Sequence, residues 1–337
     1  MPFPITDTSP VSHQGTLPPK TDVVVLGGGV LGVMTAWFLA DRGFSVVLCE
    51  KGRIAGEQSS RNWGWIRQQG RDFAELPVMM ESLAIWQDLA RTLGDCLGLR
   101  QEGTLYIART EAEMAGFAAW RDKAQGFGLD CRILGRAELA ALIPGHAAPW
   151  IGALYTPSDA RAEPWTAVPL IAKALAAKGV TIRENCAVRA LDLQAGRVAG
   201  VITEAGRIAC AQVVVAGGAW SSLFLRAHGV VIPQLAVKAS AARTITMPET
   251  FLGTLPTSIL PFAADRMAAT RSPEVGRMTL PSAPTLSGIL AHSCRCCGRR
   301  SNPPVSALPR QRIIPTPGAR SASGTQARFL RSSASAS

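Results

Sequence analysis

Residues 23–50 read VVVLGGGVLGVMTAWFLADRGFSVVLCE, and this stretch decides the fold of the chain. The segment Val23–Leu26 is continuously apolar, which is typical of a strand buried on both faces of a parallel sheet. A second apolar segment, Ser45–Leu48, leads to the acidic residue Glu50. Between the two lies a glycine-rich turn followed by a helical pattern. The stretch predicts a strand–helix–strand unit.

The glycines of the turn have the spacing G-x-G-x-x-G at Gly27, Gly29 and Gly32. In a nucleotide-binding unit the first makes a tight turn and the second lets the backbone approach a pyrophosphate. The third lets the helix pack on the strand. The start of the helix, at Val30 and Leu31, is expected to present free N–H groups to that pyrophosphate. An acid at the end of the second strand is placed to accept hydrogen bonds from a ribose. We therefore predict a dinucleotide site.

The segment after Lys51 indicates which dinucleotide is bound. Residues 56–64, GEQSSRNWG, form a polar loop rich in hydroxyl groups, which suits a cofactor whose phosphates and flavin ring extend further along the sheet edge. Ser59 and Ser60 are predicted to donate to pyrophosphate oxygens. Asn62 and Gly64 are predicted to lie against the ring, since glycine allows close approach. A solvated surface loop is the alternative interpretation.

A later segment has the same character. Residues 180–183 and 187–191 are predicted strands, and residues 196–210 form a predicted meander linked by turns. The segment VVVAGGAWS at 213–221 is then predicted to be a buried strand that runs into a turn of small residues. That turn is expected to return the backbone to the first glycine loop.

These motifs together resemble the flavin-dependent D-amino-acid oxidase-like oxidoreductases. That family includes glycine and sarcosine oxidases and D-amino-acid dehydrogenases. The resemblance rests on the stretch at 23–51, on SSRNWGWIRQQ at 59–69 and on VVVAGGAWS, and it extends from about Thr21 to about Leu260. It implies an α/β fold: a Rossmann-like FAD-binding domain of the GR2 type, joined to an α+β substrate domain.

The resemblance also implies FAD as cofactor and oxidation of a carbon that bears an amine. Hydride passes from the α-carbon of a neutral amine to the flavin N5, and water hydrolyses the resulting imine. Arg67, Gln68 and Gln69 are expected near the ring, but no residue is assigned a catalytic role and no metal site is expected. The implied cofactor-binding residues are Gly27, Gly29, Val30, Leu31, Gly32, Glu50, Lys51, Ser59, Ser60, Arg61, Asn62, Gly64, Val188, Ala216, Gly217 and Trp220.

The expected domain organisation alternates along the chain. Residues 1–20 are predicted to be a disordered leader, and residues 21–80 and 150–222 the FAD-binding domain. Residues 81–149 and 223–263 are assigned to an incomplete substrate domain, with its first sheet strands at 232–236 and 242–247. Residues 264–337 are predicted to be a disordered, low-complexity basic tail.

The positive charge of the chain is concentrated in that tail. Residues 1–263 carry 24 basic and 22 acidic side chains, whereas residues 264–337 carry 11 arginines and two acids. The net charges are therefore +2 and +9. The tail is interpreted as a change of reading frame near Pro261 and Phe262, or alternatively as a natural basic segment. Nucleic acid is not an expected partner.

Two hypotheses of different classes follow. The first is an FAD-dependent amine or D-amino-acid oxidoreductase that acts on a small molecule. The second is a truncated, non-catalytic flavoprotein fragment from a frameshifted gene. The leader has no signal-peptide pattern, so a cytoplasmic location is expected, with peripheral membrane contact left open. Substrate and electron acceptor are left open as well.

Overall fold

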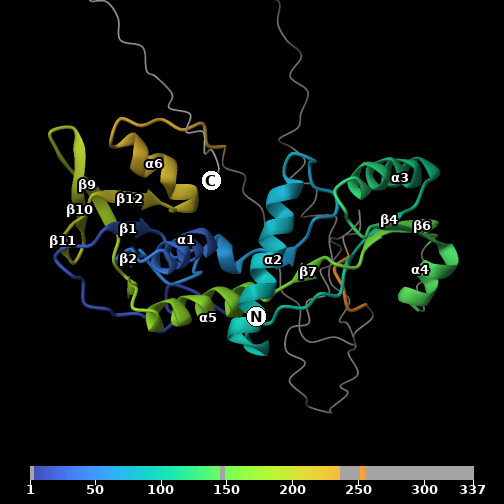
Figure 1. Ribbon diagram of the computed structural model, residues 1–337, viewed down its shortest axis with the longest axis horizontal. Coiled ribbons are helices and arrows are strands. Elements are labelled where there is room, and N and C mark those ends of the chain that lie inside the picture. The colour runs from blue at the N-terminus through green and yellow to red at the C-terminus, as the bar shows by residue number, and fades with distance from the viewer. Residues whose placement is uncertain (1–3, 145–148, 236–250, 256–337) are drawn as a thin grey trace, which may run out of the picture. The chain divides into compact units, whose positions relative to one another are not determined.

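A computed structural model describes residues 4–144, 149–235 and 251–255 (Figure 1). The predicted strand–helix–strand unit is confirmed at the centre of a parallel four-stranded sheet with the order β12-β1-β2-β8. These strands are β1 (Val23–Leu26), β2 (Val46–Cys49), β8 (Thr181–Arg183) and β12 (Gln212–Val215). Central strands of such a sheet are buried on both faces, which explains the unbroken apolar run of β1.

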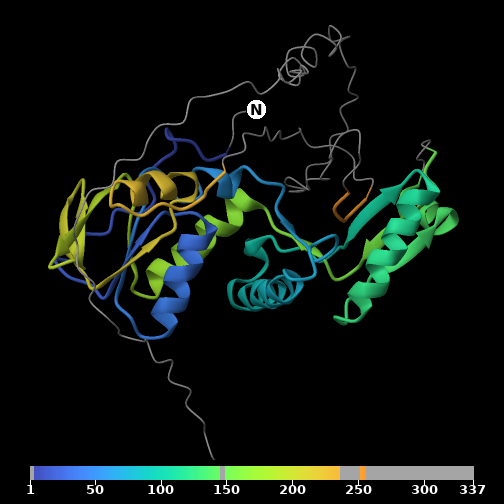
Figure 2. The same ribbon diagram turned by 90° about the horizontal axis from the view of Figure 1, so that it is seen from above.

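Alternate residues of β1 face different layers. Val23 and Val25 pack with the helices α1 (Val30–Asp41) and α5 (Pro164–Ala177), which lie side by side in Figure 2. Val24 and Leu26 pack against the antiparallel sheet on the other face, whose order is β11-β10-β9. Its strands are β9 (Val188–Gln194), β10 (Arg197–Thr203) and β11 (Gly206–Ala209). The parallel sheet is thus the middle of three layers.

The strand β12 corrects one prediction. It was expected to be a buried strand, but its residues are exposed or half-buried. Among the described residues β12 pairs only with β1, so it forms the edge of the sheet. It continues, as predicted, into a turn of small residues, here the short helix η3 (Gly218–Trp220), followed by α6 (Ser221–Arg226).

A second sheet is antiparallel and has the order β4-β6-β5. Its strands are β4 (Thr104–Ala108), β5 (Arg132–Gly135) and β6 (Gly152–Thr156), and its helices are α3 (Glu111–Gln125) and α4 (Arg136–Leu142). Residues 251–255 return beside β4: the amide of Leu105 donates to the carbonyl of Thr254 at 2.9 Å. Phe251 is buried in the core of this sheet.

Two expected domain boundaries shift. The helix α2 (Leu76–Leu93) was expected mostly in the substrate domain, but its Leu89 is buried in the core shared by β1, β2, α1 and α5. Leu97 of the short helix η2 (Asp95–Leu97) is buried in the same core. The strand β6, expected in the FAD-binding domain, is the central strand of the antiparallel sheet. Packing partners decide both assignments, and these partners are distant in sequence.

The prediction of a disordered leader is also corrected. Residues 4–20 are described by the structure and are held against the body of the protein. Gly15 donates to the carbonyl of Ile182 at 3.1 Å, and Lys20 forms a β-bridge with Ala209. The polar composition of the leader indicated disorder, but backbone pairing with strand edges does not depend on side chains.

Other predictions lie partly or wholly outside the described residues. Residues 232–235 are described and form no strand, contrary to expectation. The predicted strand at 242–247 and the basic tail at 264–337 lie beyond the described residues. Within the part of the chain that is described, no helix is both long and apolar enough to cross a membrane.

Candidate functional site

A cavity of about 670 Å³ opens at the carboxyl ends of the parallel strands. Four segments line it: the first glycine turn, the end of β2 with the loop after it, the start of β9, and the turn from β12 into η3 and α6. Ligands of doubly wound sheets bind at this edge because the loops after the strands meet there. The volume falls within the range of roughly 300–1,000 Å³ that is usual for cofactor and ligand sites.

The structure brings most of the predicted residues together in this cavity. Those that line it are Gly27, Gly29, Val30, Leu31, Glu50, Lys51, Ser59, Asn62, Val188, Ala216, Gly217 and Trp220. Gly32, Ser60, Arg61 and Gly64 do not line it. Contact of each lining residue with a cofactor stays a prediction.

The three fingerprint glycines have different local reasons to be glycine. Gly27 has a φ of +110°, and a Cβ there would lie 2.4 Å from the carbonyl oxygen of Ala216. A Cβ on Gly32 would lie 1.9 Å from the oxygen of Gly27. A Cβ on Gly29 would meet only the Ser59 hydroxyl, at 3.0 Å, and would project at the cavity wall. Gly27 and Gly32 therefore shape the turn, while Gly29 leaves bare backbone for a close ligand. This pattern fits a dinucleotide pyrophosphate.

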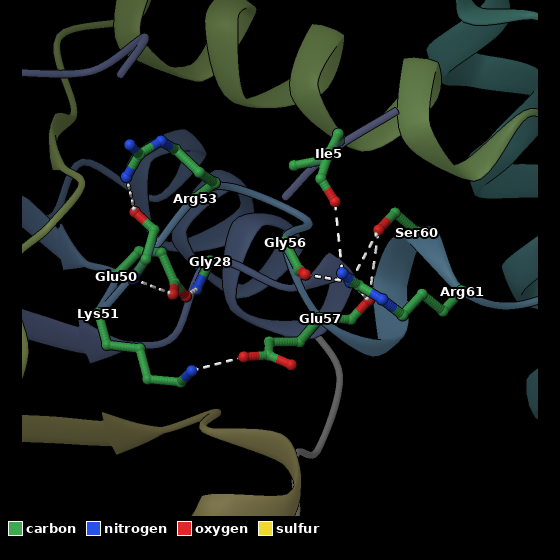
Figure 3. Close-up of polar contacts among 10 residues, drawn as sticks. Ile5, Gly28, Glu50, Lys51, Arg53, Gly56, Glu57, Ser60 and Arg61 are labelled. Atoms are coloured by element: carbon green, nitrogen blue, oxygen red, sulfur yellow. Dashed lines mark hydrogen bonds and ion pairs between the residues drawn. The ribbon is translucent and has the colours of Figure 1, made fainter. Parts of the chain in front are cut away.

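Glu50 is held by backbone amides of the glycine turn and of the loop after β2. Its carboxylate accepts hydrogen bonds from the amides of Gly28 at 2.6 Å and Gly52 at 2.7 Å, and the residue is 7% exposed (Figure 3). Burial raises the pKa of the Glu50 carboxyl, and the two amides partly offset that effect. The site therefore holds a pre-oriented carboxylate that can accept from a sugar hydroxyl.

Ser59 caps the helix that follows the glycine turn. Its hydroxyl oxygen accepts a hydrogen bond from the amide of Val30 at 2.9 Å. One of the helix N–H groups expected to face a pyrophosphate is thus already satisfied within the protein. A serine hydroxyl that accepts one hydrogen bond retains its own proton. Ser59 can therefore still donate to an anion in the cavity.

Arg61 and Asn62 stabilise the loop itself. Arg61 donates to the carbonyls of Gly56 and Glu57, and across to the carbonyl of Ile5 at 3.3 Å (Figure 3). Asn62 donates to the Gln58 carbonyl at 3.1 Å within the turn that contains η1 (Gln58–Ser60). Arg61 was predicted to contact the phosphates of the cofactor. In the structure it lies outside the cavity lining and holds the loop together.

Lys51 and Trp220 meet across the cavity. The Lys51 Nζ lies 4.1 Å from the centre of the Trp220 ring and 2.5 Å from a carboxylate oxygen of Glu57. This contact joins the end of β2 to η3. The predicted return of the second small-residue turn to the first glycine loop is confirmed by Ala216, whose amide donates to the carbonyl of Leu26 at 2.8 Å and whose oxygen lies against Gly27. An ammonium at this wall offers a positive charge to a bound phosphate.

A second, apolar cavity of about 350 Å³ adjoins the first, because Val30, Leu31, Ser59 and Asn62 line both. Gly64 and Trp65 line this second cavity together with residues of α1, α2 and α5. The predicted loop thus spans two neighbouring cavities. The structure places Gly64 in the second rather than in the first.

The segment Arg67–Gln69 lies in neither cavity. It follows β3 (Trp65–Ile66), which pairs with β7 (Ala160–Arg161). The buried carboxylate of Asp159 accepts from the amides of Gln68 at 2.7 Å and Gln69 at 3.2 Å, and burial raises its pKa. The Arg67 guanidinium lies 5.7 Å from the ring centres of both Trp65 and Tyr106. The Asp159 carboxylate, about 90 residues later in the sequence, thus holds the backbone of this segment in place.

Several cavity residues were not predicted. Arg53 and Gln58 belong to the loop after β2, Arg189 to β9, and Phe224 to α6. Arg53 could have been predicted, because it is a cationic residue only three positions after the fingerprint acid Glu50. Nothing local marks Arg189 or Phe224, because only the packing of β9 and α6 beside β12 brings them here.

Comparison with known proteins shows the family of the chain. The model of the DAO family, FAD dependent oxidoreductases, matches residues 22–288. Mouse mitochondrial sarcosine dehydrogenase is 30% identical over 236 residues, which cover 68% of this chain and 26% of that protein. Glycine oxidase from Pseudomonas putida is 34% identical over 230 residues, covering 64% and 60%.

Solved structures show the same relationship. L-amino acid deaminase from Proteus myxofaciens superposes with a TM-score of 0.64 at 33% identity, over 66% of this chain and 51% of that one. The chain thus spans about a quarter of sarcosine dehydrogenase and about half to three fifths of the other two. The family match continues to residue 288, beyond the predicted change of frame. With a matching family model over most of its length and a glycine cradle at the expected sheet edge, the chain belongs to the family of FAD dependent oxidoreductases.

Proposed function

We propose that this chain binds FAD in the larger cavity and serves an oxidoreductase that oxidises the C–N bond of an amino acid or a secondary amine. The observation that carries the proposal is the cavity itself. It brings a bare glycine backbone, a buried acid and a hydroxyl-capped helix start to one sheet edge. These are the groups that a pyrophosphate and a ribose require.

Each group has a distinct task when the cofactor is bound. Backbone at Gly29 and Gly217 would lie against the pyrophosphate, and the Ser59 hydroxyl would donate to it. The Glu50 carboxylate would accept from a ribose hydroxyl, and the Lys51 ammonium would offset negative charge. FAD supplies an acceptor for the hydride of the substrate, while the protein supplies binding, orientation and electrostatics.

The names of the relatives support the substrate class. Sarcosine dehydrogenase, glycine oxidase and L-amino acid deaminase all take their names from amino acids or an N-methylated amino acid. A small amine with a carboxylate is therefore the class to test first, including D-amino acids. A cytoplasmic location remains a prediction from the sequence, which cell fractionation would test.

Absorbance of the purified protein tests the cofactor, and anaerobic bleaching by glycine, sarcosine or D-alanine tests the reaction. We expect a flavin spectrum that fades with at least one of these amines. Failure to bind FAD after reconstitution would overturn the proposal. Bound flavin that none of the amines reduces would overturn the assigned substrate class.

Two alanine variants provide a matched pair. Gly29→Ala adds a methyl group at the cavity wall, and we expect FAD affinity to fall at least about tenfold, or about 1.4 kcal/mol. Gly116→Ala adds the same methyl group on α3, where a Cβ meets nothing within 4 Å. Because alanine is the better helix former, this control is expected to gain up to about 1 kcal/mol of stability and keep its FAD affinity.

A further inference from the structure

We infer that residues 5–15 of the leader form a strap that positions the wall of the cofactor cavity, and that Glu184 is the positioning residue that clamps it. The inference rests on the proposed FAD binding and extends it to a segment outside the nucleotide fingerprint. The strap, as defined by these residues, contacts the loop after β2 at several separate points.

Glu184 joins the strap to that loop through one carboxylate. It follows β8 and is 3% exposed. Its Oε2 accepts from the amides of Ser12 at 2.6 Å and His13 at 3.1 Å, while its Oε1 accepts from the amide of Ile54 at 2.7 Å. The amide of Glu184 also donates to the carbonyl of His13 at 3.0 Å. Both oxygens are thus used, one by the strap and one by the cavity loop.

Ile54 transmits this contact to the glycine turn. Its neighbour Ala55, with a φ of +57°, donates to the carbonyl of Gly28 at 2.9 Å. A Cβ on Gly28 would lie 2.6 Å from the Cδ1 of Ile54, so the two residues are in close contact. Gly28 in turn donates to Glu50. A left-handed alanine persists only where its surroundings hold it, and Glu184 supplies part of that constraint.

Two arginines attach the strap at further points. The Nε of Arg53, a residue of the cavity wall, donates to the carbonyl of Ser9 at 2.6 Å. Arg61 donates to the carbonyl of Ile5 (Figure 3). Arg53 also contacts the side chain of Asn185, the residue after Glu184. The strap thereby positions Arg53, the only cationic residue within 52–56.

A strap that merely adds stability and a strap that positions the cavity differ in one measurable respect. Coupling between two sites is reciprocal. If the strap orders the cavity, FAD must slow hydrogen exchange at the amides of Ser12 and His13, which lie outside the cavity lining. A purely structural strap would gain no more protection from FAD than amides far from the cavity, which FAD protects only by stabilising the fold as a whole.

The variants Glu184→Gln and Ser12→Pro test the clamp from its two sides. The glutamine removes the charge and one acceptor oxygen, whereas the proline removes the Ser12 N–H and leaves the carboxylate in place. We expect the Kd for FAD, from flavin fluorescence, to rise about tenfold in each, the size of effect typical for losing a hydrogen bond to a charged group. The Ile54 amide should exchange at least about tenfold faster in the Ser12→Pro apoprotein.

Glu113→Gln is the matched control. The Glu113 carboxylate also accepts from two backbone amides, those of Arg109 and Thr110, but it lies on α3 and lines neither cavity. Its variant should keep the wild-type Kd for FAD.

The outcomes separate the two proposals. If wild type binds FAD and both clamp variants bind it within about twofold, the strap has no positioning role although the proposed function stands. If wild type binds no FAD, the proposed function fails and the cofactor role of the strap fails with it. Unchanged Ile54 exchange in Ser12→Pro overturns the clamp in either case, since that measurement needs no cofactor.

Discussion

The ends of the neighbouring strands β2 and β8 make a useful comparison. Each is followed by a buried glutamate, Glu50 or Glu184, whose carboxylate accepts backbone N–H groups. The partners of Glu50 are Gly28, within the glycine turn of the fingerprint, and Gly52, two residues after Glu50 itself. The partners of Glu184 are Ser12, His13 and Ile54, more than a hundred residues earlier. The same place in the topology thus carries the residue proposed for cofactor recognition at one strand and the residue proposed to position the site at the next.

The largest expected effect is that of removing the turn which brings Gly28 to Glu50. In Gly32→Ala the new Cβ would lie 1.9 Å from the Gly27 oxygen, a backbone atom that cannot move without opening the turn. We expect a loss of at least about 3 kcal/mol in unfolding free energy, measured by urea denaturation, since overpacking of this kind typically costs 1–3 kcal/mol or more. FAD binding should be lost as well.

Gly43→Ala is the control for that variant. Gly43 has a φ of +83°, but a Cβ there meets nothing within 4 Å. Its cost should be backbone strain alone, about 1–2 kcal/mol, without an effect on FAD affinity. Equal losses in the two variants would mean that the turn tolerates the clash.

The next effect concerns the recognition carboxylate. Glu50→Ala leaves the Gly28 and Gly52 amides without their acceptor, and each unmet buried donor costs about 1–3 kcal/mol. We expect the Kd for FAD, measured by calorimetry, to rise about a hundredfold, equivalent to two steps of 1.4 kcal/mol. Glu184→Gln should weaken binding less, because it acts through Ile54. A larger effect at Glu184 would reverse the assignment of the two roles.

A pH series reports on the Glu50 carboxyl in the folded protein. Because burial raises the pKa of Glu50 above 4.5, the folded state retains its proton at pH values where the unfolded chain has lost it. The contribution of Glu50 to stability is therefore fully present below pH 4.5 and declines as pH rises through the raised pKa. Glu50→Gln should remove that decline in stability, measured as urea unfolding midpoints between about pH 4 and pH 8. This range begins near the ordinary pKa of a glutamate carboxyl and extends above it. An unchanged slope would contradict it.

The smallest effect concerns the helix cap beside Glu50. Ser59→Ala removes the acceptor of the Val30 amide, and loss of such a cap costs about 0.5–2 kcal/mol. Thr110→Ala removes the comparable cap of α3, where the Thr110 hydroxyl accepts from Glu113 at 3.2 Å. Thermal unfolding should show similar losses for both variants. Only Ser59→Ala should also weaken FAD binding, and equal FAD affinities would exclude the Ser59 hydroxyl from the cofactor site.

The parts of the fold that could be predicted are those whose signals are local. The apolar run of β1, the glycine spacing and the helical pattern after it each lie within a short window, and the structure confirms the strand, the turn and the helix. The position of α2 could not be predicted, because its amphipathic pattern shows that one face is buried but not against which core. The pairing of Thr254 with β4 likewise spans 150 residues.

Neighbouring residues alone are enough to predict a nucleotide-binding strand–helix–strand unit with an acid at its end, because turn geometry and strand burial are encoded locally. The cap that Ser59 provides for the helix and the hydrogen bonds by which Arg61 braces the loop are seen only in the folded chain. The tertiary structure alone shows that the leader is tied to the cavity wall through Glu184. Those roles depend on hydrogen bonds between segments far apart in the chain, and a side chain's pattern does not specify its distant partner.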